Sequence, residues 1–494
     1  MTQDLDVQYD AGPSGDDGSG RGATIIIGVL VVAIVLALIF VGVVMVTRLV
    51  SGPEATAVPS VTLRPTFTSV AEASTVTPEP TIMATATTPV VETAVPDATA
   101  TAGDATEPPA TEPTSEDTPE PPAPTPTSRP PSSPPKMASP DYGIQAFLWW
   151  QPEVAHRDLG LIRDAGFTWV KQWFSWRDIE GAGKGKFDWE TADRVVAQVE
   201  EFGLKLIVRV DHGPDWAGPP PQNTDHFVDF LTALSNRYKG SIQAYQIWNE
   251  PNLAREWGDK PPNAREYTQM LKKAYQAIKR VDPNAVVVTA GLAPTTELSA
   301  RAVPDTQFVQ AMYDAGAKPY FDMLGAHGAG YRAPPEMDPG QIATDPNYYN
   351  VGDPNCPGDA CRIYGFRHVE DLRQIMVNNG DANKRVVVLE FGWTIDERTN
   401  SPYYWHRVAD QFVQGDYMVR AYRYARDHWQ PWIGIMSLIY MPDVKWTQND
   451  EQYWWSVMEP SPVDQLYLKA PYVMLCDYIR TQRGLDRCPY LPEG

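Results

Sequence analysis

The chain has 494 residues, more than one ordinary domain, and a formal net charge of -21. This acidity argues against nucleic acid as a partner, because phosphate binding needs a basic surface. Much of the acidity lies in the N-terminal third of the chain, so it says little about an active site.

The N-terminus combines a polar, acidic tail with a long apolar run. The first 22 residues are rich in aspartate, and an uncharged run from Gly22 to Thr47 follows them. A run of this length can cross a bilayer as a helix, which takes about 20 residues. A cleavable signal peptide is the alternative, although its apolar core is usually only about 7 to 15 residues long. We expect a cytoplasmic acidic tail over residues 1–22 and a single transmembrane helix over residues 23–47.

Residues 48–140 form a linker rich in Pro, Thr, Ser and Ala, with 20 of the 47 prolines and almost no aromatic residues. Such a segment buries too little apolar surface to offset the entropy of ordering it, so we predict a disordered, extended stalk. A stalk that holds a domain away from a membrane is most useful outside the cell. We therefore expect a single-pass protein of the cell membrane, with its C-terminal domain extracytoplasmic.

Residues 141–494 have the composition of a folded domain, with strand-like and helix-like runs in alternation. The expected strands are Tyr142–Leu148, Trp169–Phe174, Lys205–Val210, Ile242–Trp248, Ala285–Ala290, Met323–Ala326, Arg385–Leu389 and Gly434–Tyr440. The expected helices are His156–Ala165, Glu190–Phe202, Asp225–Tyr238, Ala264–Val281, Thr306–Ala315, Val369–Asn378, Gly415–Trp429 and Pro471–Thr481.

Strict alternation of this kind implies parallel strands joined by helical crossovers. Eight such units fit a (β/α)8 TIM barrel, an α/β fold, with some enlarged loops. A doubly wound open sheet is the alternative, but it needs a Gly-rich phosphate turn after the first strand, and the residues after Gly143 do not provide one.

Two glutamates close strand-like runs: Glu250 follows the fourth run and Glu390 ends the seventh. Active sites of this barrel lie at the C-terminal ends of the strands. A carboxylate against an apolar wall is costly unless it is paired or hydrogen-bonded, so two of them at strand ends need a reason. Breaking a glycosidic bond takes one proton donor and one nucleophile, and a pair of carboxyl groups can supply both. The alternative is two structural carboxylates paired with arginines.

The motifs around these glutamates resemble a known group of enzymes. Trp248-Asn-Glu-Pro-Asn252 and Leu389-Glu-Phe-Gly392 resemble the acid/base and nucleophile motifs of retaining glycoside hydrolases. These enzymes share a (β/α)8 barrel with catalytic glutamates on strands 4 and 7, and the nearest types are families 39, 5 and 42. The resemblance covers residues 141–482. It implies that Glu250 is the acid/base, that Glu390 is the nucleophile, and that Asn249 contacts the sugar 2-hydroxyl.

The resemblance also implies further substrate-binding residues. The clan often has a His or Tyr after strand 6, where this chain has His327 and Tyr331, with simple loop packing as the alternative. Arg209 and His212 close strand 3, and Arg209 either keeps Glu390 ionised or pairs with Asp211.

Aromatic residues near strand ends are candidate sugar subsites, because the apolar faces of sugars stack on aromatic rings. Trp173 and Trp393 are such residues, with packing in a large core as the alternative. Tyr440 ends strand 8, where many relatives carry Trp. The enlarged segment Gly328–Tyr364 after strand 6 is expected to shape substrate choice.

The four cysteines all lie in the C-terminal part of the chain. Outside the cell they permit two disulfides, and the sequence-local pairing joins Cys356 to Cys361 and Cys476 to Cys488. A zinc site is an alternative, but the spacings do not form the usual C-x2-C pairs. Four unpaired thiols are the other alternative.

The sequence lacks the motifs of several other enzyme classes. The sequence has no G-x-S-x-G elbow of an esterase and no H-E-x-x-H or closely spaced His pair for a metal. We expect no cofactor and no metal. The predicted function is a retaining glycosidase that hydrolyses O-glycosidic, β-linked bonds of an extracellular poly- or oligosaccharide by double displacement. The alternatives are a transglycosylase with the same site and a non-catalytic carbohydrate-binding or wall-anchoring module.

Overall fold

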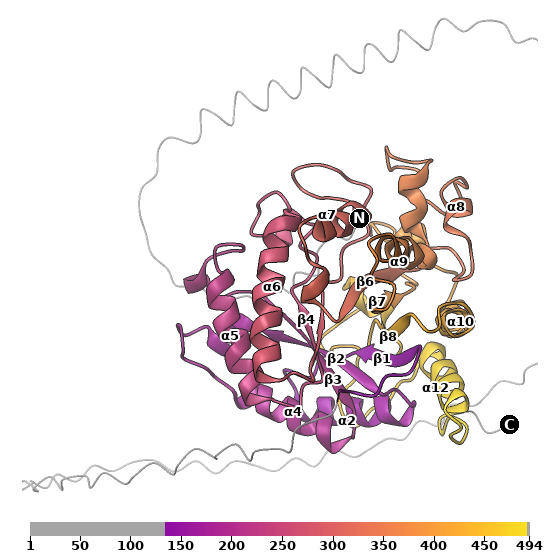
Figure 1. The fold of residues 1–494 in the computed structure, drawn as a ribbon. Helices are drawn as coiled ribbons and strands as arrows, with labels where there is room; N and C mark the ends of the chain where they lie inside the picture. The colour runs from indigo at the N-terminus through magenta and orange to yellow at the C-terminus, as the bar shows by residue number, and fades with distance from the viewer. Residues whose placement is uncertain (1–133, 492–494) are drawn as a thin grey trace, which may run out of the picture. The chain divides into compact units, whose positions relative to one another are not determined.

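The computed structural model describes residues 134–491, and they fold around a closed barrel of eight parallel strands in sequence order. Figure 1 shows the strands at the centre and the helices outside them. The strands are β1 (Asp141–Gln145), β2 (Trp169–Ser175), β3 (Lys205–Asp211), β4 (Ala244–Ile247), β5 (Val286–Val288), β6 (Met323–Ala329), β7 (Arg385–Gly392) and β8 (Ile433–Leu438). The predicted (β/α)8 barrel is confirmed.

The strands are apolar on both faces because helices cover the outside and side chains fill the inside. In β7 the run Val386–Leu389 is completely buried. Its three valines are β-branched and suit an extended backbone. A second, smaller cluster fills the barrel interior, with Trp169, Ile207, Leu389 and Ile435 among its members.

Helices follow the strands and form the outer layer (Figure 1). The α-helices are α2 (Pro152–Asp164), α3 (Trp176–Glu180), α4 (Glu190–Glu201), α5 (Thr224–Arg237), α6 (Ala264–Val281), α7 (Asp305–Asp314), α8 (Pro339–Ile342), α9 (Val369–Asn378), α10 (Gln411–His428), α11 (Glu451–Trp455) and α12 (Ala470–Gln482). Short 3-10 turns lie between them, and one of these, η2 (Ala254–Glu256), follows β4 close to the site.

The predicted boundaries hold best where apolar periodicity is strong. Helices α6 and α9 have the predicted bounds. Helix α10 begins at Gln411, earlier than expected, because the side chain of Asp410 caps it by accepting from the backbone N–H groups of Phe412 and Val413. Strand β4 ends at Ile247, so Glu250 lies in the turn beyond it rather than at the strand end itself.

The predicted transmembrane helix over residues 23–47 lies outside the described residues, as does most of the predicted linker. The end of the linker, however, packs on the barrel. Lys205 Nζ donates to the Lys136 carbonyl at 2.6 Å, and Ser139 Oγ donates to the Ile433 carbonyl at 2.7 Å. Both contacts lie where β3 and β8 begin, so the chain enters the barrel at the face opposite the C-terminal strand ends. None of the helices between residues 134 and 491 combines the length and apolarity needed to cross a membrane.

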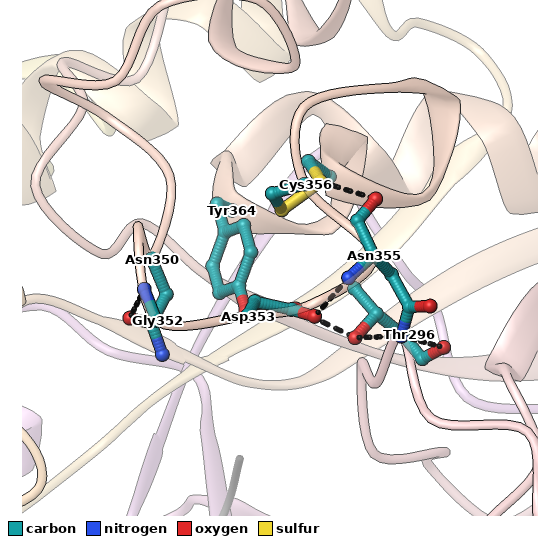
Figure 2. The surroundings of a disulfide bond; sticks show 8 residues. Thr296, Asn350, Gly352, Asp353, Asn355, Cys356 and Tyr364 are labelled. Atoms are coloured by element: carbon teal, nitrogen blue, oxygen red, sulfur yellow. Dashed lines mark hydrogen bonds between the residues drawn. A yellow bond between two sulfur atoms is a disulfide. The ribbon is translucent and has the colours of Figure 1, made fainter. Parts of the chain in front are cut away.

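Both predicted disulfides are present, Cys356–Cys361 and Cys476–Cys488. The first lies in the long segment after β6, shown in Figure 2. Close to it, Asp353 Oδ2 accepts from Thr296 Oγ1 at 2.6 Å and from the Tyr364 hydroxyl at 2.7 Å. Because Thr296 follows β5, these bonds tie the segment after β6 to the loop after β5.

Candidate active site

The two glutamates predicted from the motifs lie at the mouth of the barrel. Glu390 is inside β7, where its register partner on β6 is His327. Glu250 lies in the turn after β4, and its backbone N–H donates to the Gly291 carbonyl beyond β5 at 3.0 Å. The neighbouring strands therefore bring residues distant in the sequence to one edge of the barrel.

The turn that carries Glu250 has an unusual backbone. Trp248 and Glu250 both have positive φ angles, 68° and 42°. Non-glycine residues in this left-handed region carry strain on the order of 1–3 kcal/mol, and such residues cluster at functional sites. The strained turn holds Glu250 with only 8% of its side chain exposed.

His327 lies between the two carboxylates. Its Nδ1 is 3.1 Å from Oε1 of Glu250, and its Nε2 is 3.9 Å from Oε1 of Glu390. The imidazole is buried, and Nε2 has no hydrogen-bond partner among the described residues. A Cβ at Gly291 would come within 2.1 Å of this nitrogen, so only glycine leaves room for the ring.

Lys171 is a residue of this site that sequence reasoning missed. It projects from β2 into the barrel, where its Nζ lies 2.9 Å from Oε1 of Glu390 and also donates to the Leu389 carbonyl. A single lysine within the apolar run Trp169–Phe174, two residues from a tryptophan on either side, was the available signal.

The charges around Glu390 favour its ionised form. Burial alone would raise the pKa of Glu390, but Lys171, His327 and Arg209 outweigh it and lower the pKa to about 2. Burial also lowers the pKa of Lys171, although the glutamate opposes this. Glu390 is therefore a carboxylate at any physiological pH, as a nucleophile must be.

Three predicted residues converge on Asp211 at the end of β3, which was predicted only as a partner of Arg209. Arg209 Nε and Trp173 Nε1 each donate to its carboxylate at 2.5 Å, and His212 Nδ1 lies 2.9 Å from it. Burial lowers the pKa of His212, but Asp211 outweighs it and raises the pKa overall. Both roles expected for Arg209 are therefore seen together. It pairs with Asp211, and its charge favours the ionised form of Glu390.

Asn249 is buried beside Glu250, and its Oδ1 accepts from Gln246 Nε2 at 3.3 Å. The same Gln246 amide donates to the Trp248 carbonyl at 3.0 Å. These two hydrogen bonds hold the turn after β4 and orient the side-chain amide of Asn249.

Tyr331 and Tyr440 lie in the loops after β6 and β8, each among other aromatic rings. Tyr331 packs edge-on against Tyr364, with ring centroids 5.0 Å apart. Tyr440 meets Trp446 at 5.3 Å and also contacts Phe147 after β1. Burial keeps the pKa of Tyr440 well above its usual value, and the charges of Glu451 and Glu390 add to this rise. Both tyrosines are thus near the carboxylates.

Trp393 does not lie where a sugar could stack on it. Its side chain is completely buried, and its Nε1 donates to the Ala333 carbonyl at 2.9 Å. The ring packs against Phe366 and Tyr417 outside the barrel wall. The predicted substrate-binding role of Trp393 is therefore corrected to a packing role. At this strand end its side chain points away from the barrel mouth and is covered by neighbouring side chains.

Two further ionisable residues follow Glu250 in the short helix η2. Arg255 Nη2 lies 3.3 Å from Oε2 of Glu250, and Arg255 Nε lies 3.8 Å from Oε1 of Glu256. Burial raises the pKa of Glu256 to about 7, and the charge of Glu250 adds to this rise. Neither residue belongs to a motif, so neither could be singled out from the sequence.

On the other side of the mouth, Glu451 in α11 accepts from Trp455 Nε1 at 2.7 Å. Burial raises its pKa to about 8, and the charges of Asp396 and Glu390 contribute. Carboxyl groups whose pKa is raised in this way concentrate at functional sites.

A pocket of about 490 Å³ opens between the loops after β5 and β6. Its lining residues are Thr295, Pro304, Thr306, Gln307, Asp359, Ala360, Arg362, Ile363, His368 and Asp371. Neither Glu250 nor Glu390 lines it. Among residues 134–491, no three His, Cys, Asp or Glu side chains are grouped as metal ligands.

Comparisons with known proteins agree with this arrangement. Residues 135–315 match the family Cellulase (glycosyl hydrolase family 5), a range that includes Glu250 and ends before Glu390. Searching the curated proteins gave no match.

Among solved structures, a family 39 glycoside hydrolase from Bacteroides cellulosilyticus WH2 is similar at 18% identity and a TM-score of 0.50, over 70% of this chain and 65% of that chain. A glucosidase from Croceicoccus marinus is similar at 13% identity and a TM-score of 0.49, over 71% of this chain and 69% of that chain. The chain thus spans about two thirds of the length of these structures, and at such identities the likeness concerns the fold. The predicted resemblance to glycoside hydrolases, enzymes that act on glycosidic bonds, is confirmed by the family match, and the solved structures share the barrel fold.

Proposed function

We propose that this chain is a retaining glycosidase that hydrolyses O-glycosidic, β-linked bonds of a poly- or oligosaccharide outside the cell. The observation that carries the proposal is the contact of one imidazole, His327, with both Glu250 and Glu390 at the barrel mouth. A proton donor and an ionised nucleophile on facing strands are what double displacement requires.

In the first half of the reaction, Glu390 attacks the anomeric carbon while Glu250 gives its proton to the leaving oxygen. The bond from sugar to leaving group breaks, and a glycosyl ester of Glu390 forms. Lys171 supports this step because it holds Glu390 ionised in a buried position. Asn249, oriented by Gln246, is placed to bind the sugar beside the acid.

In the second half, ionised Glu250 takes a proton from water, which attacks the anomeric carbon and releases Glu390. The sugar leaves with the configuration it had in the substrate. Glu250 is again protonated, so each turnover consumes one water and returns both carboxyl groups to their starting states.

The stereochemistry of the released sugar tests the mechanism. Retaining enzymes hold the two carboxyl groups about 5–5.5 Å apart, whereas inverting enzymes need about 6.5–9.5 Å to admit a water. Proton NMR of the first product from a β-linked aryl glycoside should show the β-anomer before mutarotation. Initial release of the α-anomer would overturn the retaining mechanism. Glycosyl transfer to added sugars in place of water would instead support the transglycosylase.

We also propose that the chain is anchored in the cell membrane by residues 23–47, with residues 48–140 as a stalk. The apolar run, the proline-rich composition and the two disulfides support an extracytoplasmic barrel. Lys136 and Ser139 contact the starts of β3 and β8, at the end of the barrel opposite Glu250 and Glu390. Protease added to intact cells should release the barrel, and a barrel that stays protected until the cells are lysed would overturn this placement.

A further inference from the structure

The acid/base of a retaining glycosidase must alternate between two states within one turnover. It is protonated when the leaving group departs and ionised when water attacks. A permanent cation beside it would favour the ionised state only, and a permanent anion would favour the protonated state only. The surroundings of Glu250 include one permanent cation, Arg255, and one carboxyl group, Glu256, on the same short helix.

Arg255 lies between Glu250 and Glu256. Its Nη2 is 3.3 Å from Glu250 Oε2, and its Nε is 3.8 Å from Glu256 Oε1, so one guanidinium faces two carboxyl groups. The arginine side chain is 34% exposed and that of Glu256 is 22% exposed, so both border the solvent at the mouth. The backbone of Glu256 is held, because Trp248 Nε1 donates to its carbonyl at 2.8 Å.

Resting on the proposed function, we propose that Arg255 and Glu256 act together as positioning residues that set the proton affinity of Glu250 in both halves of the reaction. When Glu250 carries the proton, the guanidinium pairs with ionised Glu256. When Glu250 has given the proton away, the guanidinium pairs with Glu250. The cation is matched by a carboxylate in both states, so neither state of the acid/base is strongly disfavoured.

The other ionisable groups around the pair do not replace either residue. His327 faces Glu250 from β6, and Tyr331 acts on it from the loop after β6. Arg209, Asp211 and His212 face Glu256 from β3. Arg209 and His212 also favour ionised Glu256, but both bind Asp211, whereas Arg255 lies within 4 Å of both glutamates. The pKa of Glu256 is raised to about 7, so its charge changes near neutral pH.

The pH dependence of kcat/KM on an aryl glycoside tests the proposal, because its alkaline limb reports loss of the essential proton from the free enzyme. In Glu256→Gln the anion is gone and the alkaline limb should move to lower pH by about one unit, the usual scale of a single nearby charge. In Arg255→Met the cation is gone and the limb should move to higher pH. Arg255→Lys keeps the charge and should leave the limb in place.

Glu266→Gln is the matched control, since Glu266 lies at the start of α6 and accepts from Trp257 Nε1 without contacting Glu250. Its limb should not move. A limb that stays in place in both Glu256→Gln and Arg255→Met, or that moves in the same direction in both, overturns the proposal. Thermal unfolding identifies a variant that has lost its fold. If Arg255→Met is such a variant, the alkaline limb of Arg255→Lys tests the role of the arginine instead. If Glu250→Ala itself keeps full activity, the proposed function fails; if only the limbs fail to move, this inference fails alone.

Discussion

The ammonium group of Lys171 lies 2.9 Å from the carboxylate of Glu390, and the exposed fractions of the two side chains are only 1% and 12%. This buried pair joins β2 to β7 across the barrel interior. It gives Glu390, the proposed nucleophile, a fixed counter-ion that no motif in the sequence indicates.

We expect Lys171→Met to move the acid limb of kcat/KM to higher pH. The pKa of Glu390 is about 2 rather than its ordinary 4.5, so its ionised form contributes stability above pH 4.5 that is lost as the pH falls toward 2. Without the lysine, the largest charge that lowers the pKa is lost and the pKa rises, although His327 and Arg209 still oppose burial. Each unit of rise costs about tenfold in activity on the acid side. Lys171→Arg, which keeps the charge, should lose much less, and equal acid limbs in Lys171→Met and the parent protein would contradict the assigned role.

Glu250→Ala and Glu390→Ala should fail in different ways. Loss of Glu390 removes the nucleophile, so activity falls to background on every substrate. Loss of Glu250 removes the proton donor, which contributes roughly 10²- to 10⁴-fold. An aryl glycoside with a good leaving group needs little protonation and should still form the glycosyl enzyme, detectable by mass spectrometry.

Added azide should rescue turnover of Glu250→Ala and yield a β-glycosyl azide from a β-linked substrate. Glu201→Ala is a suitable control, since this glutamate is exposed and pairs only at the surface with His156. A loss of less than about threefold in Glu250→Ala on both natural and activated substrates would show that the acid/base assignment is wrong.

The stability of the barrel should fall at alkaline pH because of His368. This buried histidine lies 2.8 Å from Asp305 and 3.0 Å from Asp371. Burial lowers its pKa, but the two carboxylates outweigh this and raise the pKa to about 10, above the ordinary 6.5. Its contribution to stability is therefore fully present below pH 6.5 and is lost as the pH rises toward 10.

Urea unfolding at pH 6 and pH 9.5 measures this effect. His368→Gln should be less stable at pH 6 and should show a smaller decrease between the two pH values than the parent protein. His156→Gln, at a half-exposed surface position, should keep the parent's decrease. A parent protein with equal unfolding free energies at both pH values would refute the prediction.

The bond Cys476–Cys488 should stabilise the end of the chain by about 3 kcal/mol, the value that the chain-entropy model gives for a loop of this length. It ties the segment after α12 to that helix across a sequence separation of 12 residues. Non-reducing peptide mapping of exported protein should recover both predicted pairs. The variant with Ser at both positions should unfold at lower urea concentration yet keep kcat, since the bond lies away from the mouth.

The other bond, Cys356–Cys361, lies in the segment that Asp353 ties to the loop after β5 (Figure 2). We expect its double Ser variant to change KM more than kcat, since the segment borders the mouth and holds no catalytic carboxylate. A change confined to kcat would contradict this.

The sequence by itself predicted the barrel, which the structure confirms, and it singled out the two glutamates as candidate catalytic residues. Regular alternation of apolar strands and amphipathic helices leaves few other topologies, and Glu250 and Glu390 each lie in a short motif next to a strand. The local cysteine spacing likewise predicted the correct disulfides. These features depend on neighbours in the chain, so a pattern of a few residues suffices to indicate them.

Only the tertiary structure decided which charges surround the glutamates. Lys171 comes from β2, His327 from β6 and Arg255 from the turn after β4, and barrel closure alone brings them together. The same closure puts Trp393 outside the wall, although its position next to the nucleophile motif suggested a sugar subsite. A side chain's direction at a strand end depends on register and on local bulges, such as the shift in pairing between β6 and β7, and these arise from packing between strands far apart in the sequence.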